Sequence, residues 1–254
     1  MHIATDGIVL RERAVDEFDS VLTLLTQERG VISAYARGAR KPRSAIRVSA
    51  ELLSYSHFVL FANRDRYQVD KADLNRLFMG IRGDVVRLSL AAYFCQITSE
   101  IAPHEEEAGP YLKLLLNTLY LLDTGKRRED FLKPVYELRL LTMAGYMPDL
   151  VACSQCGAYE AQSIYFLPQS SCLLCGDCLE QEKLREPVER LTPGILAAMR
   201  HILYSAPEKL FQFSLPEAGL QALEGVIQRY LLLQLDKRFD TLDFYLTMKG
   251  HTNG

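Results

Sequence analysis

The sequence lacks an uninterrupted apolar run long enough to cross a bilayer. Its longest strongly apolar stretches are residues 88–97, 111–122 and 230–235. Each is interrupted by polar residues or too short, since a spanning helix needs about 20 apolar residues. The first residues also lack the cationic start and the apolar segment of a secretory signal. We therefore expect a cytoplasmic protein with no membrane partner.

Catalytic motifs are missing as well. The five histidines are isolated, without metal-ligand spacing, and no G-x-S-x-G segment is present. Residues 124–127 lack the upstream glycine and the Ser or Thr of a phosphate-binding loop. Nothing in these patterns favours an enzyme or a small-molecule substrate.

The overall charge gives little sign of a generic polyanion binder, because the 254 residues carry a net charge of −3. Hydrophobic residues at 48% and charged residues at 24% are typical of a folded globular chain and exclude a disordered one. The charge is uneven, however. Residues 1–80 hold 12 Lys and Arg, ten of them Arg, against 10 Asp and Glu. The arginine guanidinium can donate two hydrogen bonds to phosphate oxygens at once, which the lysine ammonium does less well. An anionic partner is therefore expected to bind residues 1–80.

The first 80 residues are rich in β-strand patterns. Strands are predicted at residues 8–13, 21–26, 31–37, 52–61 and 67–72, with turn chemistry between them. Alternation in the third strand places Ile32, Ala34 and Ala36 inward, and Val31, Ser33, Tyr35 and Arg37 on the other face. Five short strands suggest a small barrel of the oligonucleotide-binding (OB) type. An SH3-like barrel has a similar strand count, so the count alone cannot distinguish the two.

From about residue 81 the apolar period becomes helical. Helices are predicted at residues 85–101, 110–123, 128–144, 194–204 and 216–235. The expected fold class is therefore α+β and multidomain. The expected domains are an OB-type β-barrel at 1–80, an all-α domain at 81–149 and 188–245, and an inserted four-cysteine zinc finger at 150–187.

The cysteines give the sharpest local pattern, because five of the six lie between Cys153 and Cys178. Two C-x2-C pairs separated by 15 to 18 residues have the spacing of a tetrahedral zinc site. We expect one structural Zn²⁺ held by Cys153, Cys156, Cys175 and Cys178, which leaves no open coordination position. Cys172 could replace Cys178, since it forms its own C-x2-C pair with Cys175.

A basic segment follows the third predicted strand. It has five cations in eleven residues, with no acid between Glu28 and Glu51. Gly38 and Pro42 make it a loop, and a cationic loop on a small barrel suits a phosphate backbone. Tyr35 adds a ring on which a base can stack. The candidate DNA-binding residues are Tyr35, Arg37, Arg40, Lys41, Arg43 and Arg47. A solvated basic loop remains the alternative interpretation.

Three segments together, Gly7–Leu10, Glu17–Thr26 with Gly30, and Arg37–Ser44, resemble the opening of the bacterial RecO family of DNA repair proteins. The similarity continues through the helical part and the cysteine insert. The resemblance implies an OB barrel that binds single- and double-stranded DNA and anneals complementary strands without ATP. It also implies that the protein, with RecR, helps to load RecA onto SSB-coated DNA and is associated with the nucleoid.

The resemblance further implies that the C-terminal tail of SSB docks on the helical domain. A tail with acidic residues and an apolar end needs a cation beside an apolar pocket. The candidate cations are Arg127, Arg128 and Arg139, with Lys126 and Lys133, beside Phe131, Tyr136 and Leu140. The alternative interpretation is a solvated helix start.

Two other classes of protein are alternative interpretations of the cysteine pattern and the charges. A sequence-specific zinc-finger regulator needs a recognition helix rich in Arg, Asn and Gln, whereas the flank at residues 179–183 is acidic. A zinc-containing DNA-processing enzyme, such as a nuclease, needs clustered carboxylates for a metal. Only the turn at Asp16, Glu17 and Asp19 offers any.

Overall fold

The computed structural model of the protein describes residues 1–63, 66–181 and 186–252. The chain divides into two compact units, one of Met1–Arg127 with Phe239–Gly254 and the other of Arg128–Arg238. The strands are β1 (His2–Ala14), β2 (Ser20–Thr26), β3 (Gly30–Ala36), β4 (Tyr55–Asn63), β5 (Arg66–Arg76), β6 (Ile164–Leu167), β7 (Cys172–Cys175) and β8 (Glu189–Leu191). The helices are α1 (Met79–Arg82), α2 (Val85–Ile101), α3 (Gly109–Asp123), α4 (Glu129–Met143), α5 (Gly176–Gln181), α6 (Pro193–Tyr204), α7 (Glu217–Leu235) and α8 (Asp240–Thr252).

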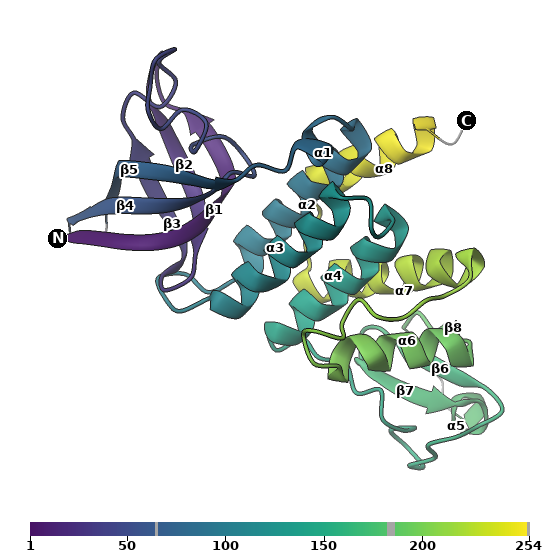
Figure 1. The fold of residues 1–254 in the computed structure, drawn as a ribbon. Helices are drawn as coiled ribbons and strands as arrows, with labels where there is room; N and C mark the ends of the chain where they lie inside the picture. Colours follow the sequence, from purple (N-terminus) through teal and green to yellow (C-terminus); the bar gives the residue numbers. More distant parts are fainter. Residues whose placement is uncertain (64–65, 182–185, 253–254) are drawn as a thin grey trace. The chain divides into compact units, whose positions relative to one another are not determined.

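The first five strands close into a barrel in the order β1-β2-β3-β5-β4 (Figure 1). Every neighbouring pair is antiparallel except β3 and β5, which run parallel. A five-stranded barrel closed by such a non-sequential pair is a Greek-key arrangement of the OB type. The topology therefore confirms the predicted OB-type barrel, which strand count alone could not distinguish from an SH3-like one.

The barrel core is built from alternate strand residues, because successive side chains of a strand point to opposite faces. Ile32, Ala34 and Ala36 of β3 are buried in this core, as their alternation predicts. Val31 was expected on the outer face but is only 3% exposed. Its backbone N–H donates to the carbonyl of Pro103 at 2.8 Å, so the connection from α2 to α3 covers this end of β3.

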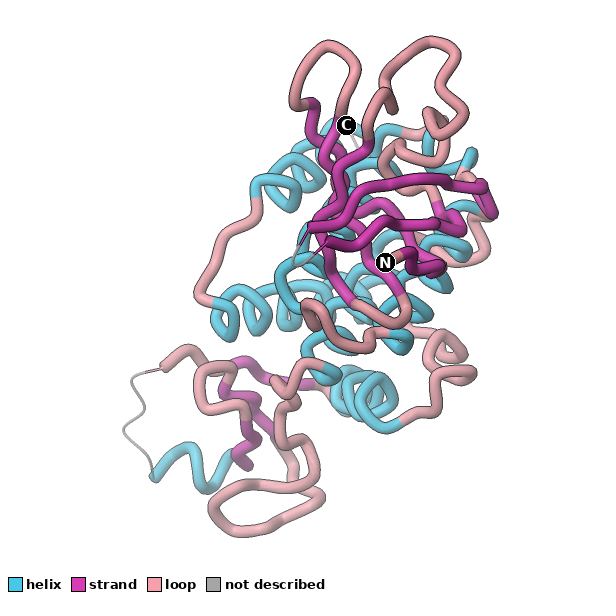
Figure 2. The backbone as a smooth tube through the Cα atoms, turned by 90° about the vertical axis from the view of Figure 1, so that its left-hand side faces the viewer, coloured by secondary structure: helices cyan, strands magenta, loops and turns pink. Residues whose placement is uncertain are grey.

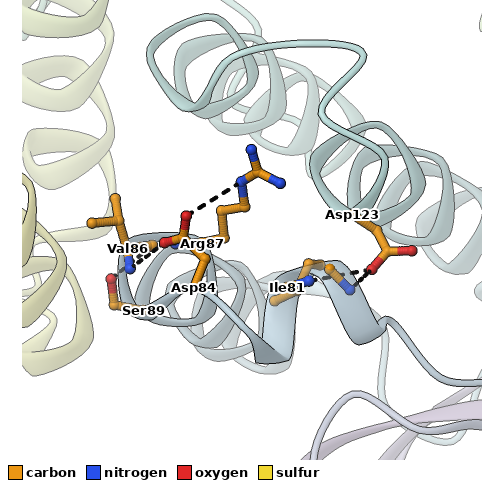
Figure 3. Close-up of polar contacts among 7 residues, drawn as sticks. Ile81, Asp84, Val86, Arg87, Ser89 and Asp123 are labelled. Atoms are coloured by element: carbon orange, nitrogen blue, oxygen red, sulfur yellow. Dashed lines mark hydrogen bonds and ion pairs between the residues drawn. The ribbon is translucent and has the colours of Figure 1, made fainter.

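In the first unit the helices follow the barrel, and α2 packs against α1, α3 and α8 (Figure 1). The Asp84 carboxylate caps α2 by accepting from the backbone N–H groups of its first turn. Figure 3 shows that the Asp123 carboxylate at the end of α3 accepts from the backbone N–H of Ile81, and Gly80 donates to the same oxygen at 2.8 Å. A Cβ at Gly80 would lie 2.2 Å from the Asp123 carbonyl oxygen, so this close approach requires glycine. The short helix α1 is thereby tied to the end of α3.

The second unit combines α4, α6 and α7 with a small sheet of order β7-β6-β8, whose strands are drawn in magenta in Figure 2. The sheet is fixed to α7 because the ring of Phe166 on β6 packs edge-on against Tyr230, with ring centroids 5.3 Å apart. Among the described residues, no helix is long and apolar enough to cross a membrane.

The predicted helices agree with α2, α3, α4, α6 and α7 to within a residue or two at each end. α8 lies beyond the last predicted helix. Asp236 ends α7 in a left-handed conformation, with φ of +46°, and the chain then starts again as α8. The two compact units divide the predicted helical domain, because α1 to α3 and α8 belong with the barrel. The boundaries of independently folding domains stay a prediction.

Candidate nucleic-acid interface and metal centre

The basic loop, residues 37–47, leaves β3 as a run of tight turns. Gly38, with φ of +65°, begins the first turn, in which the backbone N–H of Lys41 donates to the Gly38 carbonyl at 3.1 Å. Ala39 and Ala50 are buried in the barrel core and anchor both ends of the segment. Its five cations, Arg37, Arg40, Lys41, Arg43 and Arg47, are all exposed. The loop therefore presents its charge to solvent from a fixed backbone.

An acidic turn lies directly against this loop. In the β2–β3 hairpin Ser20 pairs with Ala36, which brings the end of the β1–β2 turn beside the start of the basic loop. The Asp19 carboxylate accepts from the backbone N–H of Gly38 at 2.7 Å, and an Arg40 Nη donates to the Asp16 carbonyl at 2.9 Å. The expectation of cations without a nearby countercharge is thus wrong. The sequence shows no acid near the loop along the chain, but the β2–β3 hairpin brings Asp16 and Asp19 beside it from eighteen or more residues away.

Tyr35 is half-buried, and its hydroxyl donates to the Asp19 carboxylate. This hydrogen bond holds the pKa of Asp19 below its usual value and raises the pKa of Tyr35. The Tyr35 side chain therefore links β3 to the acidic turn. Its predicted role as a stacking surface for a base, like the DNA contacts of the five cations, stays a prediction.

The carboxylates of the acidic turn do not converge on a cation. One oxygen of Asp16 accepts from the backbone N–H groups of Phe18 and Asp19, each at 2.8 Å. Asp19 is engaged with Tyr35 and Gly38. Within the described residues, the group placed to hold a metal ion is the cysteine cluster instead. The structure thus offers no support for a nuclease-type metal site at this turn.

The four predicted ligands come together in the second unit. The sulfur atoms of Cys153, Cys156, Cys175 and Cys178 all lie within 4.8 Å of one another, close enough to bind one metal ion. Cys153, Cys175 and Cys178 are buried, and Cys156 is exposed. Four thiolates around one ion are the donor set of a closed, structural site.

Backbone geometry of the two knuckles explains the cluster. Ser154 donates its backbone N–H to the Leu173 carbonyl at 2.8 Å, which lays the first knuckle along β7. Gly157, with φ of +73°, completes that knuckle in a conformation that favours glycine. At Gly176 a Cβ would lie 2.3 Å from the Ser163 hydroxyl oxygen, so that hydroxyl would have to turn away. Glycine is thus favoured in the first knuckle by its backbone angle, and in the second it leaves room for the Ser163 hydroxyl.

The thiols of the cluster have pKa values shifted in opposite directions. Burial alone would raise the pKa of Cys153, but backbone N–H groups of its own knuckle and of β7 lower that pKa to about 6. The hydrogen bond to Cys175 raises the pKa of Cys178 well above its usual value. Cys172 lies outside the cluster and accepts from the Ser154 hydroxyl at 3.5 Å. Cys95 is buried in α2, and burial raises its pKa to about 12, as suits a packed core thiol.

The apolar residues predicted to line a pocket for the SSB tail do not lie on the surface. Phe131, Tyr136 and Leu140 are buried core residues of α4, with exposures of 4% or less. Lys133 is fully buried and pairs with the Glu137 carboxylate at 2.9 Å. The pattern of charged and apolar residues along α4 is as the sequence indicates, but the helix packs that face against α6 and α7. This part of the predicted partner site is therefore wrong.

The three arginines of that prediction are separated by the structure. Arg127 is half-buried and belongs to the first unit. Arg128 forms ion pairs with Asp130 at 2.7 Å and with Glu217 at 3.7 Å. Arg139 donates to two carbonyl oxygens in the last turn of α6, and burial lowers its pKa. Arg139 thus stabilises a helix end, and partner binding by Arg127, Arg128 and Arg139 stays a prediction.

The helix beside the second knuckle, α5, is only six residues long and carries no arginine or asparagine. Residues 182 and 183 of the acidic flank lie outside the described residues. A helix of this length and composition gives no support to a zinc-finger regulator that reads bases from the major groove.

Comparison with known families covers most of the chain. The model described as "Recombination protein O N terminal" matches residues 1–78, and "Recombination protein O C terminal" matches residues 82–243. The chain is 36% identical over 247 residues to the DNA repair protein RecO of Acetivibrio thermocellus, covering 97% of each chain. It is 30% identical to that of Symbiobacterium thermophilum, covering 96% of this chain and 97% of the relative. It is also 30% identical to that of Alkaliphilus metalliredigens, with coverages of 96% and 98%. With an OB-type barrel, a helical part and a clustered four-cysteine site all in place, the chain belongs to the RecO family of DNA repair proteins.

Proposed function

We propose that this protein binds DNA through the basic loop and the adjoining barrel face and anneals complementary single strands. With RecR, it would help to load RecA onto SSB-coated DNA. The observation that carries the proposal is the run of five exposed cations on an anchored loop of an OB-type barrel. Membership of a DNA repair family supports the same partner. Binding to DNA would associate the protein with the nucleoid.

Annealing needs no catalytic group. Two strands repel each other through their phosphates, and cations on the protein reduce that repulsion while the bases stay free to pair. A loop with exposed guanidinium groups and a buried alanine anchor can reduce this repulsion without holding the strands in one particular alignment. The proposed activity is therefore binding and positioning, with no ATP and no small-molecule substrate.

The metal of the cysteine cluster is proposed to be Zn²⁺. Four sulfur ligands at one point favour zinc, and a closed set of ligands makes the ion structural. The bound ion would hold the first knuckle against β7, so that the insert keeps its shape.

RecR and the SSB tail are proposed as protein partners on the strength of family membership. For the tail, the second unit offers a cleft that α4 does not. Its walls include the apolar Leu232 and Leu233 of α7 and the cations Lys237 and Arg238. Arg229 also lines the cleft but is ion-paired with Glu189. An acidic peptide with an apolar end has the matching chemistry. Titration of a labelled tail peptide tests this, and an unchanged affinity for Arg238→Glu would exclude the cleft.

The salt dependence of DNA binding tests the main proposal. Replacing Arg40, Lys41 and Arg43 together with alanine removes up to three phosphate contacts. Each contact to a single strand contributes about 0.7 to the slope of log K against log salt, so the slope should fall by about 2. The loss should be similar for every DNA sequence, because phosphate contacts carry no base information. Annealing of SSB-coated complementary oligonucleotides without ATP should slow in the same variant.

A matched control separates a local effect from one of net charge. Lys113 on α3 and Arg190 and Lys209 of the second unit are exposed cations outside the basic loop and outside the proposed tail cleft, and alanine at all three removes the same charge. This control should keep the parent slope and the parent annealing rate. If the loop variant binds and anneals like the parent at every salt concentration, the loop is a solvated basic segment and the proposal is wrong. Equal losses in both variants would also refute it.

A further inference from the structure

One aromatic side chain beside the basic loop has no role in the barrel core. Phe18 lies in the middle of the acidic turn between β1 and β2, and its side chain is 39% exposed. In OB-type barrels the loop between the first two strands is one of those that bind oligonucleotides. An exposed ring at this position is therefore placed where a nucleic acid can reach it.

The backbone of Phe18 is held from both sides. Its N–H donates to the Asp16 carboxylate at 2.8 Å, and its carbonyl accepts from the backbone N–H of Arg40 at 3.0 Å. The neighbouring Asp19 is fixed in turn by Gly38 at 2.7 Å. A ring on a backbone fixed in this way loses little conformational freedom when a ligand binds, which favours affinity.

Cations of the basic loop lie beside this ring and its turn. The Lys41 ammonium lies 5.6 Å from the centroid of the Phe18 ring. The Arg40 side chain donates a hydrogen bond to the Asp16 carbonyl of the same turn. A nucleotide offers a flat base and a phosphate a few ångströms apart. The ring and these cations match that pair of features, whereas Tyr35 has its hydroxyl bound to Asp19 and is only partly exposed.

We propose that Phe18 is a base-stacking residue of the single-strand site, with phosphates on Arg40 and Lys41. This inference rests on the proposed DNA-binding function of the basic loop and adds the contact that distinguishes unpaired from paired DNA. Stacking requires a base that has left its own stack, so the contribution applies to single strands and not to intact duplex.

A tryptophan at position 18 gives a direct reading of stacking, because the sequence contains no tryptophan. In Phe18→Trp the only indole of the protein would stand at the proposed site. Addition of a single-stranded oligothymidylate should quench its fluorescence, and the matching duplex should quench it little. Tyr204→Trp in the second unit, where the parent side chain is 52% exposed, serves as the control and should show no such quenching.

Affinity provides the second reading. Stacking of one base on an aromatic ring contributes about 1–3 kcal/mol, so Phe18→Ala should weaken single-strand binding by about 5- to 140-fold. The salt slope should stay at the parent value, because no phosphate contact is removed. Val15→Ala, a 50% exposed apolar residue of the same turn, should bind like the parent. Duplex affinity should be unchanged in both.

The outcomes separate this inference from the function on which it rests. If Phe18→Ala binds single strands like the parent while the triple loop variant is weakened, Phe18 is not a stacking residue and the DNA-binding loop stands. If the triple variant also binds like the parent, both proposals are wrong. Equal quenching of Phe18→Trp by single strand and duplex would overturn the stacking role even if affinity falls.

Discussion

Replacement of one cysteine of the cluster should separate the metal site from the DNA site. In Cys175→Ser the sulfur that lies 3.7 Å from that of Cys156 is lost, and one of four ligands goes with it. Cys172→Ser is the matched control, three residues earlier on the same strand and outside the cluster. We expect the first variant to lose its zinc and the second to keep it.

The expected magnitude follows from how the insert is held. Structural zinc sites supply about 10–16 kcal/mol of apparent binding free energy in peptides at neutral pH. The knuckle at residues 153–158 is otherwise held to β7 by Ser154, whose backbone and hydroxyl both donate to the Leu173 carbonyl. Two such bonds contribute about 0.5–1.5 kcal/mol each, far less than the metal. The knuckle should therefore open, while β6 stays on α7 through the fully buried ring of Phe166.

Elemental analysis and hydrogen exchange together check this prediction. The parent and Cys172→Ser should each hold one zinc per chain, and Cys175→Ser should hold little. Fast exchange in the serine variant should be confined to the insert, and single-strand binding should be retained because the basic loop lies in the other unit. Parent protein purified without chelator and found free of zinc would refute the reasoning, as would fast exchange throughout the barrel of Cys175→Ser.

Two further substitutions test the structure. Tyr35→Phe removes the hydrogen bond that most lowers the pKa of Asp19, so that pKa should rise toward its usual value in an NMR titration. The bond favours the charged carboxylate, so its contribution to stability is present above the ordinary carboxyl pKa and is lost as the pH falls. The variant should therefore be less stable than the parent at neutral pH and equally stable in acid. A titration of Asp19 unchanged from the parent would contradict this prediction. Lys133→Ala removes a buried cation that lies 2.9 Å from Glu137 and 3.9 Å from Glu224, and it should cost about 3–5 kcal/mol in chemical unfolding of the second unit. A loss of unfolding free energy below about 1 kcal/mol, the scale of an exposed ion pair, would contradict this prediction.

Local patterns were sufficient for much of this protein. Strand alternation at Ile32, Ala34 and Ala36 identified the inward face of β3, and the spacing of Cys153, Cys156, Cys175 and Cys178 identified the cluster. Both patterns work because the residues concerned are neighbours on one element or on two adjacent knuckles. Residue type and spacing are enough to predict the four-cysteine cluster, so no contact between distant segments has to be known.

Other features were decided by tertiary contacts. α4 carries cations and apolar residues that suggest a surface patch, but burial against α6 and α7 places Lys133 and Tyr136 inside the core. The basic loop has no acid nearby along the chain, yet the β2–β3 hairpin brings Asp16 and Asp19 to it. Residue type and spacing thus determined the barrel strands and the four-cysteine cluster. Which charges remain available to a partner was decided only by the fold, because burial and pairing depend on segments that the sequence places far apart.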